Sequence, residues 1–277
     1  LSTEMKSWLA LEIGNSRLHW GWFEGENLRE TWNTPHLSSS IEQQLAQCKT
    51  LADLPEEILS STPIALKSKI QNLKLLPRIY IASVVPTQTA LWQAYPEIHV
   101  MTLDKIPLLG VYPTLGIDRA LSVLGAGETF GFPTLVIDAG TALTFTGADG
   151  DRCLVGGAIL PGLSLQLQSL GQTANLPSIT TPEILALPKR WALNTPEAIQ
   201  SGVIYALIAS IRDFITSWWK KFPHSQICFK GGDGNLLLEY LRSLHPEFVR
   251  THSCAPLLYE PNLTFWGMRS YKRGAGG

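Results

Sequence analysis

The chain has 277 residues and a mass of 30.5 kDa, a length that suits one large or two ordinary domains. Hydrophobic residues make up 45% and charged residues 16%, which is enough apolar material for a sizeable core and excludes a largely disordered chain. The 22 basic and 23 acidic residues give a net charge of −1 without a basic run. The composition therefore gives no sign of a nucleic-acid partner.

The apolar runs and the cysteines indicate in which cellular compartment the protein works. The longest apolar runs, such as residues 204–211, are well short of the ~20 residues that cross a bilayer, and no apolar stretch of signal-peptide length precedes Glu12. The four cysteines show neither CxxC spacing nor pairing with histidines. We expect a cytoplasmic protein with core thiols, no membrane segment and no zinc site.

The first half alternates strand and helix patterns. An apolar run at 8–13 ends in Gly14-Asn15, and alternating residues at 17–23 lead to a second turn at 24–27, which predicts a β-meander. The next predicted elements are a helix at 41–48, a buried strand at 78–85 and a helix at 87–95. Strands interleaved with helices predict an α/β fold.

The second half opens as the first does. A strand at 134–137 ends in Asp138-Ala139-Gly140-Thr141, and strands at 142–146 and 153–160 follow, separated by a turn. The segments 11–16 and 137–142 share the order apolar, acid, small or apolar, glycine, hydroxyl or amide, small. This predicts an internal duplication. Apolar periodicity then predicts a long helix at 195–219, with Pro196 in its first turn.

The two strand–turn units carry chemistry. An acid at the end of a strand, followed by glycine, places a carboxylate beside backbone N–H groups that an anion can reach. One such turn alone is more often an ordinary hairpin, but the duplicated pair predicts a grip on a polyphosphate. A third glycine cluster, residues 230–234, would let a nucleoside approach the backbone.

Three further segments each allow two interpretations. Asp118-Arg119 precedes an apolar helix and could be a helix cap, or a general base beside a cation of the kind that phosphoryl transfer to an alcohol requires. Thr195 could likewise be the N-cap of its helix. The glycine-rich segment 156–162 could approach a ligand or form a β-bulge.

Together the motifs strongly resemble those of the type III pantothenate kinases, a branch of the actin-like, Hsp70-like and sugar-kinase-like ATPase superfamily. The resemblance rests on five motifs in family order, spanning residues 12–202: Ile13-Gly14-Asn15-Ser16, Gly116-Ile117-Asp118-Arg119, Asp138-Ala139-Gly140-Thr141-Ala142, residues 156–162, and Asn194-Thr195 leading into 198–202. Residues 231–233 extend it. The resemblance implies an α/β, two-lobed actin-like (ribonuclease H-like) fold with a duplicated core, its lobes at 1–117 and 118–277.

The resemblance also implies ATP-dependent phosphorylation of pantothenate, the first step toward coenzyme A, with Asp118 as general base. Pantothenate would contact Tyr112, Gly116, Ile117, Asp118, Arg119 and Thr195. ATP would contact Glu12, Ile13, Gly14, Asn15, Ser16, Arg17, Leu18, His19 and Thr141. Asp138 would hold a monovalent cation, potassium or ammonium, and magnesium would accompany ATP. Family members are homodimers with the substrate pocket at the subunit interface.

Two alternatives stay open from the sequence. One is a related kinase that acts on a sugar or another small hydroxy acid. The other is a nucleotide-binding accessory transcription regulator, as some relatives are described. The intact Asp118-Arg119 pair favours a catalyst.

Overall fold

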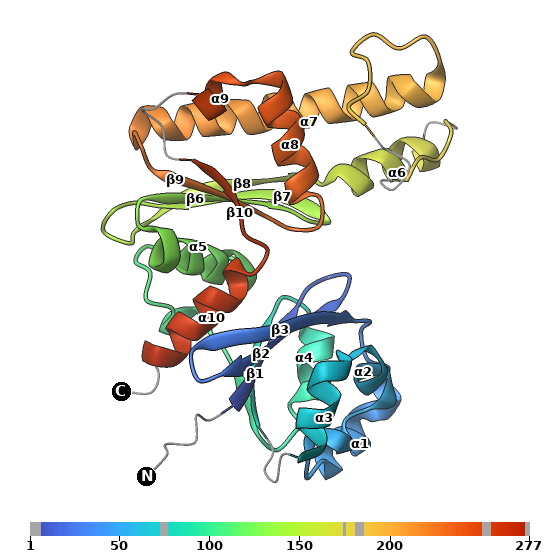
Figure 1. Cartoon of the computed structure of the whole chain (residues 1–277), viewed down its shortest axis with the longest axis vertical. Coiled ribbons are helices and arrows are strands. Elements are labelled where there is room, and N and C mark those ends of the chain that lie inside the picture. The colour runs from blue at the N-terminus through green and yellow to red at the C-terminus, as the bar shows by residue number, and fades with distance from the viewer. Residues whose placement is uncertain (1–6, 73–76, 174–175, 181–185, 251–255, 275–277) are drawn as a thin grey trace. The chain divides into compact units, whose positions relative to one another are not determined.

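The computed structural model describes residues 7–72, 77–173, 176–180, 186–250 and 256–274 (Figure 1). The chain forms two compact units. The first comprises Leu1–Pro107, Val111–Gly125 and Thr264–Gly277, and the second comprises Leu108–Gly110 and Ala126–Leu263. Each unit contains one five-stranded sheet, so the predicted α/β fold is confirmed.

The sheet of the first unit begins with the predicted meander. Its strands are β1 (Ser7–Ile13), β2 (Leu18–Glu24), β3 (Asn27–Thr34), β4 (Arg78–Ser83) and β5 (Ile98–Val100), in the order β3-β2-β1-β4-β5. β1, β2 and β3 pair antiparallel, whereas β4 is parallel to β1 and to β5. β1 is therefore the central strand, and its C-terminal end carries the first acid–glycine turn.

Alternation along β2 gives its two faces different partners. Trp20 packs on Trp92 with a ring separation of 5.2 Å, in the core beneath α1 (Glu42–Gln47), α2 (Glu56–Ser61), α3 (Ile64–Asn72) and α4 (Pro86–Trp92). Its neighbour His19 instead packs on Phe265 of α10 (Leu263–Gly274), at 4.8 Å. Because successive strand residues point to opposite faces, α10 covers the face away from α1–α4.

The second sheet repeats this plan. Its strands are β6 (Thr134–Ala139), β7 (Ala142–Ala148), β8 (Leu154–Pro161), β9 (Gln226–Lys230) and β10 (Leu257–Tyr259), in the order β10-β9-β6-β7-β8. β6, β7 and β8 form an antiparallel meander, and β9 is parallel to β6 and to β10. Read from β6, this is the arrangement of β1–β5, which confirms the predicted duplication.

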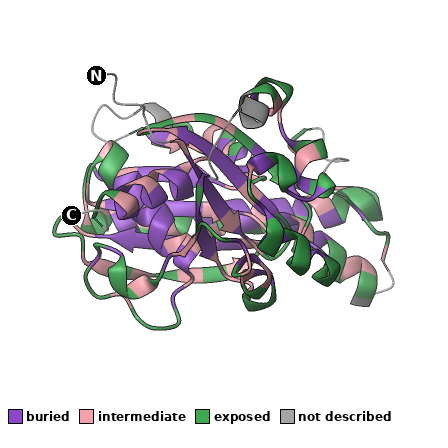
Figure 2. Ribbon diagram, turned by 90° about the horizontal axis from the view of Figure 1, so that it is seen from below, coloured by how far each residue is buried: buried purple, intermediate pink, exposed green. Residues whose placement is uncertain are grey.

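The helices of the second unit are α6 (Leu163–Thr173), α7 (Thr195–Lys221), α8 (Gly234–Leu244) and α9 (Glu247–Arg250). By length and composition α7 could cross a membrane. Nine of its residues, from Ile199 to Trp218, are buried, and the apolar ones belong to the core of the second unit. Figure 2 shows this segregation of buried and exposed faces along the helices.

The units differ from the predicted lobes, 1–117 and 118–277, at two helices and at Leu108–Gly110, which belongs to the second unit. Most of α5 (Ile117–Phe130) and nearly all of α10 group with the first unit. The packing gives the reason: a Cβ on Gly267 of α10 would overlap the backbone carbonyl of Leu121 of α5. The two helices are therefore in backbone contact, which only glycine allows at position 267.

Candidate active site

The first acid–glycine turn joins β1 to β2. Gly14 N donates to the carbonyl of Arg17 at 3.1 Å, closing a hairpin in which Asn15, Ser16 and Arg17 are exposed. His36 Nε2 lies 2.7 Å from the Gly14 carbonyl oxygen. Ile13 and Leu18, at the ends of the strands, are almost fully buried. Their side chains belong to the core, and only their backbone groups face the turn.

Glu12, just before this turn, is linked by hydroxyl groups to the helix that carries Asp118. Thr264 Oγ1 of α10 donates to Glu12 Oε1 at 3.1 Å, and Thr264 Oγ1 lies 3.1 Å from Ser122 Oγ of α5. Ser122 Oγ in turn lies 2.7 Å from the carbonyl oxygen of Asp118. Thr264 and Ser122 are each 1% exposed, so this buried hydroxyl network orients the half-buried Glu12 carboxylate.

His19 pairs with Glu12 across β1 and β2. Its Nδ1 lies 2.7 Å from Asn33 Oδ1, and its ring packs on Phe265. These contacts hold the His19 imidazole on the face of the sheet that α10 covers. The packing on Phe265 explains why a flat ring suits this position.

Asp118 lies in the first turn of α5, one residue after the helix begins. Ala120 N and Arg119 N both approach the Gly116 carbonyl, so Gly116 supplies the first helical acceptor. Asp118 is thus inside the helix rather than at its N-cap, and its Oδ1 accepts from Arg119 N at 2.8 Å. A Cβ at position 116 would lie 2.5 Å from Asp118 Oδ1. Glycine is therefore needed at 116 to leave room for the carboxylate.

Arg119 and Tyr112 are brought together in front of this helix. Arg119 Nη1 donates to the Tyr112 hydroxyl at 3.3 Å, and Leu115 N donates to the Tyr112 carbonyl in the intervening turn. Tyr112 is 40% exposed. A guanidinium and a phenol side by side present donors to an acidic or polar ligand.

The second acid–glycine turn joins β6 to β7 and is packed against two glycines. A Cβ at Gly162 would overlap the Gly140 carbonyl, and Gly231, with φ of +88°, lies against Ala139 and Asp138. Gly162 N donates to the carbonyl of Thr141 at 2.9 Å, and Thr141 itself is exposed. Close backbone packing thus holds the turn while leaving Thr141 accessible.

Asp138 has a charged partner. Lys230 Nζ at the end of β9 lies 3.3 Å from Asp138 Oδ2, and the two side chains are 6% and 23% exposed. The residues are direct neighbours in the parallel pairing of β6 and β9. Register alone therefore places the ammonium beside the carboxylate.

Thr195 is exposed at the start of α7. The N-cap is Asn194, whose Oδ1 accepts from Glu197 N at 3.0 Å, so the capping interpretation of Thr195 is wrong. Asn is as good a cap as Thr, and capping leaves the threonine hydroxyl available. Residues 154–161 form the edge strand β8, and its pairing with β7 shifts register between Gly147 and Ala148. This irregularity agrees with the β-bulge interpretation of the glycine-rich segment.

Among the residues that the structure describes, no group of three or more histidine, cysteine or acidic side chains could hold a metal ion. Cys48, Cys153 and Cys228 are free thiols. Burial, reinforced by Asp53, raises the pKa of Cys48 to about 11, and burial raises the pKa of Cys228 to about 12. Both are inert core thiols, as expected.

Several residues that contact predicted site residues have no role predicted from the sequence, among them Ser122, Lys230 and Thr264. Thr264 belongs to α10, whose apolar residues 265, 266, 268 and 271 recur at helical spacing and could have revealed the helix. Lys230 belongs to the glycine cluster at residues 230–234, but only the pairing of β9 with β6 shows that it lies beside Asp138.

The duplicated sheet plan with an acid–glycine turn in each unit defines an actin-like ATPase or sugar-kinase fold. A hexokinase of the ROK type from Thermus thermophilus matches with a TM-score of 0.51 at 13% identity, covering 96% of this chain and 98% of that one. A Baf family protein from Campylobacter jejuni matches with a TM-score of 0.60 at 19% identity, covering 97% and 98%. These likenesses establish the fold alone.

Sequence comparison goes further. A family model described as type III pantothenate kinase matches residues 8–217. A type III pantothenate kinase of Nostoc sp. is 54% identical over 270 residues, 96% of this chain and 95% of the relative. The chain belongs to the type III pantothenate kinase family.

Proposed function

We infer that this chain phosphorylates pantothenate to 4′-phosphopantothenate at the expense of ATP, the first step of coenzyme A biosynthesis. Its membership of the family over residues 8–217 carries this conclusion. The geometry of Asp118 agrees with it, because the carboxylate sits at a helix start without serving as the cap. No described feature favours a sugar kinase or a transcription regulator.

Asp118 is the proposed general base. Transfer of a phosphoryl group to a primary alcohol needs a carboxylate that orients the hydroxyl and accepts its proton as the new P–O bond forms. The bond from Arg119 N and the space left by Gly116 hold the Asp118 carboxylate in one orientation. Such positioning supports a catalytic use of this side chain.

Arg119, Tyr112 and Thr195 are proposed to contact pantothenate. A guanidinium binds a carboxylate with two parallel hydrogen bonds, and pantothenate carries one carboxylate. The hydrogen bond from Arg119 to the Tyr112 hydroxyl supports their acting together on the substrate. Thr195 adds an exposed hydroxyl at the start of α7.

ATP is proposed to contact residues 12–19 and Thr141, mainly through backbone N–H groups of the two turns. The family implies ATP with a divalent metal. Magnesium usually keeps several waters and takes one or two carboxylates besides substrate phosphates, so single acids such as Glu12 fit magnesium that arrives with ATP. This chain's part is to orient the phosphates, whereas bound magnesium offsets their charge.

A potassium or ammonium ion at Asp138 was expected from the family resemblance. The donor set here does not suit one, because Lys230 Nζ lies 3.3 Å from Oδ2 and already supplies a positive charge beside this carboxylate. A second cation at the same carboxylate would be repelled by the ammonium.

A homodimer in the cytoplasm is the proposed working form, with the substrate pocket at the subunit interface. Trp191 is 86% and Leu193 fully exposed, and Ile159 is 65% exposed on the edge strand β8. Large exposed apolar side chains and an open sheet edge are typical of surfaces that another chain covers. Free thiols agree with a reducing compartment.

The proposed function is tested with purified protein, ATP and magnesium, by following ADP release with and without pantothenate and detecting the phosphorylated product by mass spectrometry. We expect ADP release to require pantothenate and to match product formation. Release that is independent of pantothenate, or restored by glucose in its place, would reject the proposal.

A further inference from the structure

The pair formed by Asp138 and Lys230 is built by the fold rather than by chance contact of surface side chains. Direct pairing of Asp138 with Lys230 across β6 and β9 fixes their spacing, and the Asp138 Oδ2 to Lys230 Nζ distance is 3.3 Å. The lysine side chain is only 6% exposed. A buried ammonium is retained only where an opposite charge compensates the lost hydration.

The backbone that follows Lys230 packs closely beside the Asp138–Lys230 pair. Gly231, directly after Lys230, has φ of +88°, and a Cβ there would lie 2.6 Å from Asp138 Oδ1. The hydroxyl of Tyr259 donates to the Gly231 carbonyl at 3.3 Å. The backbone at Gly231 thus runs close to the Asp138 side chain and leaves no room for a larger residue at position 231.

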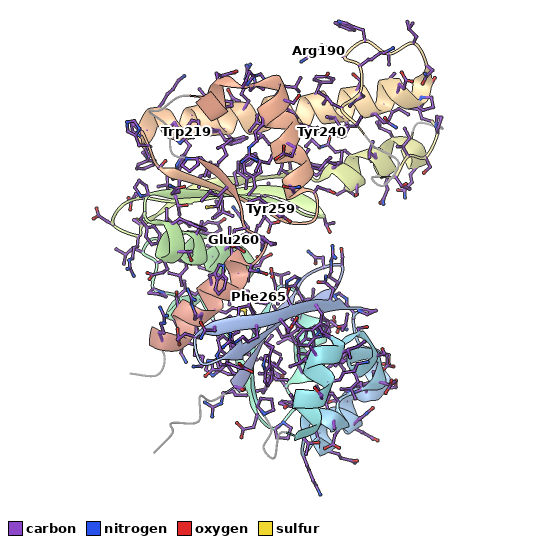
Figure 3. All side chains as sticks on the ribbon, viewed as in Figure 1. Arg190, Trp219, Tyr240, Tyr259, Glu260 and Phe265 are labelled. Atoms are coloured by element: carbon purple, nitrogen blue, oxygen red, sulfur yellow. The ribbon has the colours of Figure 1, made fainter. Side chains whose placement is uncertain are left out.

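Two further titratable side chains, Tyr259 and Glu260, lie near the pair. Tyr259 is the last residue of β10 and Glu260 follows it directly (Figure 3). Burial raises the pKa of Tyr259, Glu260 and Asp138 raise it further, and Lys230 opposes them. These four side chains therefore form one electrostatic cluster, in which Lys230 is the cation that acts on both Asp138 and Tyr259.

We propose that the Lys230 ammonium is a resident cation, which takes at Asp138 the place of a free potassium or ammonium ion. An alkylammonium carries the same charge as potassium and donates N–H bonds to a carboxylate. By neutralising Asp138 it lowers the repulsion between this carboxylate and a polyphosphate at the Gly140–Thr141 turn. The chain consequently needs no added monovalent cation. This role rests on the proposed use of that turn by ATP.

Lys230 is proposed to act through Asp138 as a positioning residue. The experiment therefore measures nucleotide binding as well as turnover. The dissociation constant of a fluorescent ATP analogue and the rate of ADP release are measured at constant ionic strength in potassium, ammonium, sodium and tetramethylammonium chloride. The variants are Lys230→Ala, Lys230→Arg, and Lys230→Ala with Asp138→Asn. Lys220→Ala, on the exposed face of α7, is the control.

For the natural sequence we expect equal nucleotide affinity in all four salts. Lys230→Ala should bind nucleotide about tenfold more weakly in tetramethylammonium and recover in potassium or ammonium, because a coupling between two bound ligands is typically five- to 150-fold. Lys230→Arg should stay salt-independent, and the double variant should not recover in any salt.

Tighter nucleotide binding by the natural sequence in potassium than in tetramethylammonium would overturn the proposal. So would undiminished binding by a folded Lys230→Ala variant in tetramethylammonium. If Lys230→Ala does not fold, the comparison of salts on the natural sequence still decides. If the natural sequence binds nucleotide equally well in all four salts but shows no pantothenate-dependent turnover, the proposed function is rejected. The role of Lys230 as resident cation is then still supported.

Discussion

Single residues at the start of α5 explain why the motif Gly116-Ile117-Asp118-Arg119 has its order. Gly116 leaves space for the Asp118 carboxylate, Ile117 is buried, and Arg119 gives its backbone N–H to Asp118 and its guanidinium to Tyr112. Each of the four positions thus has a different structural reason for its residue. Replacing Gly116 by a larger residue would displace the Asp118 carboxylate even though the carboxylate itself is unchanged.

Arg119→Ala should raise the KM for pantothenate about 10- to 100-fold and leave kcat nearly unchanged. A hydrogen bond to a charged group contributes about 1.5–3 kcal/mol, and a grip on the substrate carboxylate persists from ground state to transition state. Steady-state kinetics on this variant and on Arg29→Ala, a 45% exposed arginine of β3, provide the comparison. An unchanged KM would remove Arg119 from the substrate site.

At the scale of elements, α10 is among those that sequence reasoning missed. Helix 195–219, the first meander and the second strand–turn–strand unit were predicted within a few residues, since periodicity and turn glycines are local signals. The pairing of α10 with α5 joins positions far apart in the chain. Only the tertiary structure brings Thr264 to Glu12.

Gly267→Ala should lower the free energy of unfolding by about 1–3 kcal/mol, because the added methyl overlaps the Leu121 carbonyl and forces the two helices apart. Chemical denaturation followed by circular dichroism measures the change. Gly150→Ala, at an exposed turn with open space around it, is the matched control. Equal stability of the two variants would show that α10 does not pack closely on α5.

For the whole molecule, the sequence predicted the duplicated plan, because both halves keep the same acid–glycine turn. It predicted less of the site's electrostatics. The position of Lys230 beside Asp138 depends on the register of two strands separated by about ninety residues, which no local pattern encodes. At Thr195 the signal is local, but two neighbouring residues could each cap the helix, and the structure shows that Asn194 is the cap.

The proposed dimer predicts a mass of two chains in solution. Replacing both Trp191 and Leu193 by serine should yield monomers with unchanged circular dichroism, since the change removes exposed apolar area from the proposed interface. Ile64→Ser, an equally exposed apolar residue of α3, should stay dimeric. Sedimentation equilibrium distinguishes the forms, and a double variant that remained dimeric would place the interface elsewhere.

The central claim is that Asp118 accepts the proton of the pantothenate hydroxyl, and Asp118→Asn tests it most directly. Asparagine keeps the size and can still accept from Arg119 N, so the helix should form as before. General-base catalysis contributes about 10²–10⁴-fold in rate. The matched control is Asp213→Asn, on the exposed face of α7. We predict that kcat of Asp118→Asn falls within that range with ATP affinity unchanged, whereas kcat near that of the natural sequence would contradict the account.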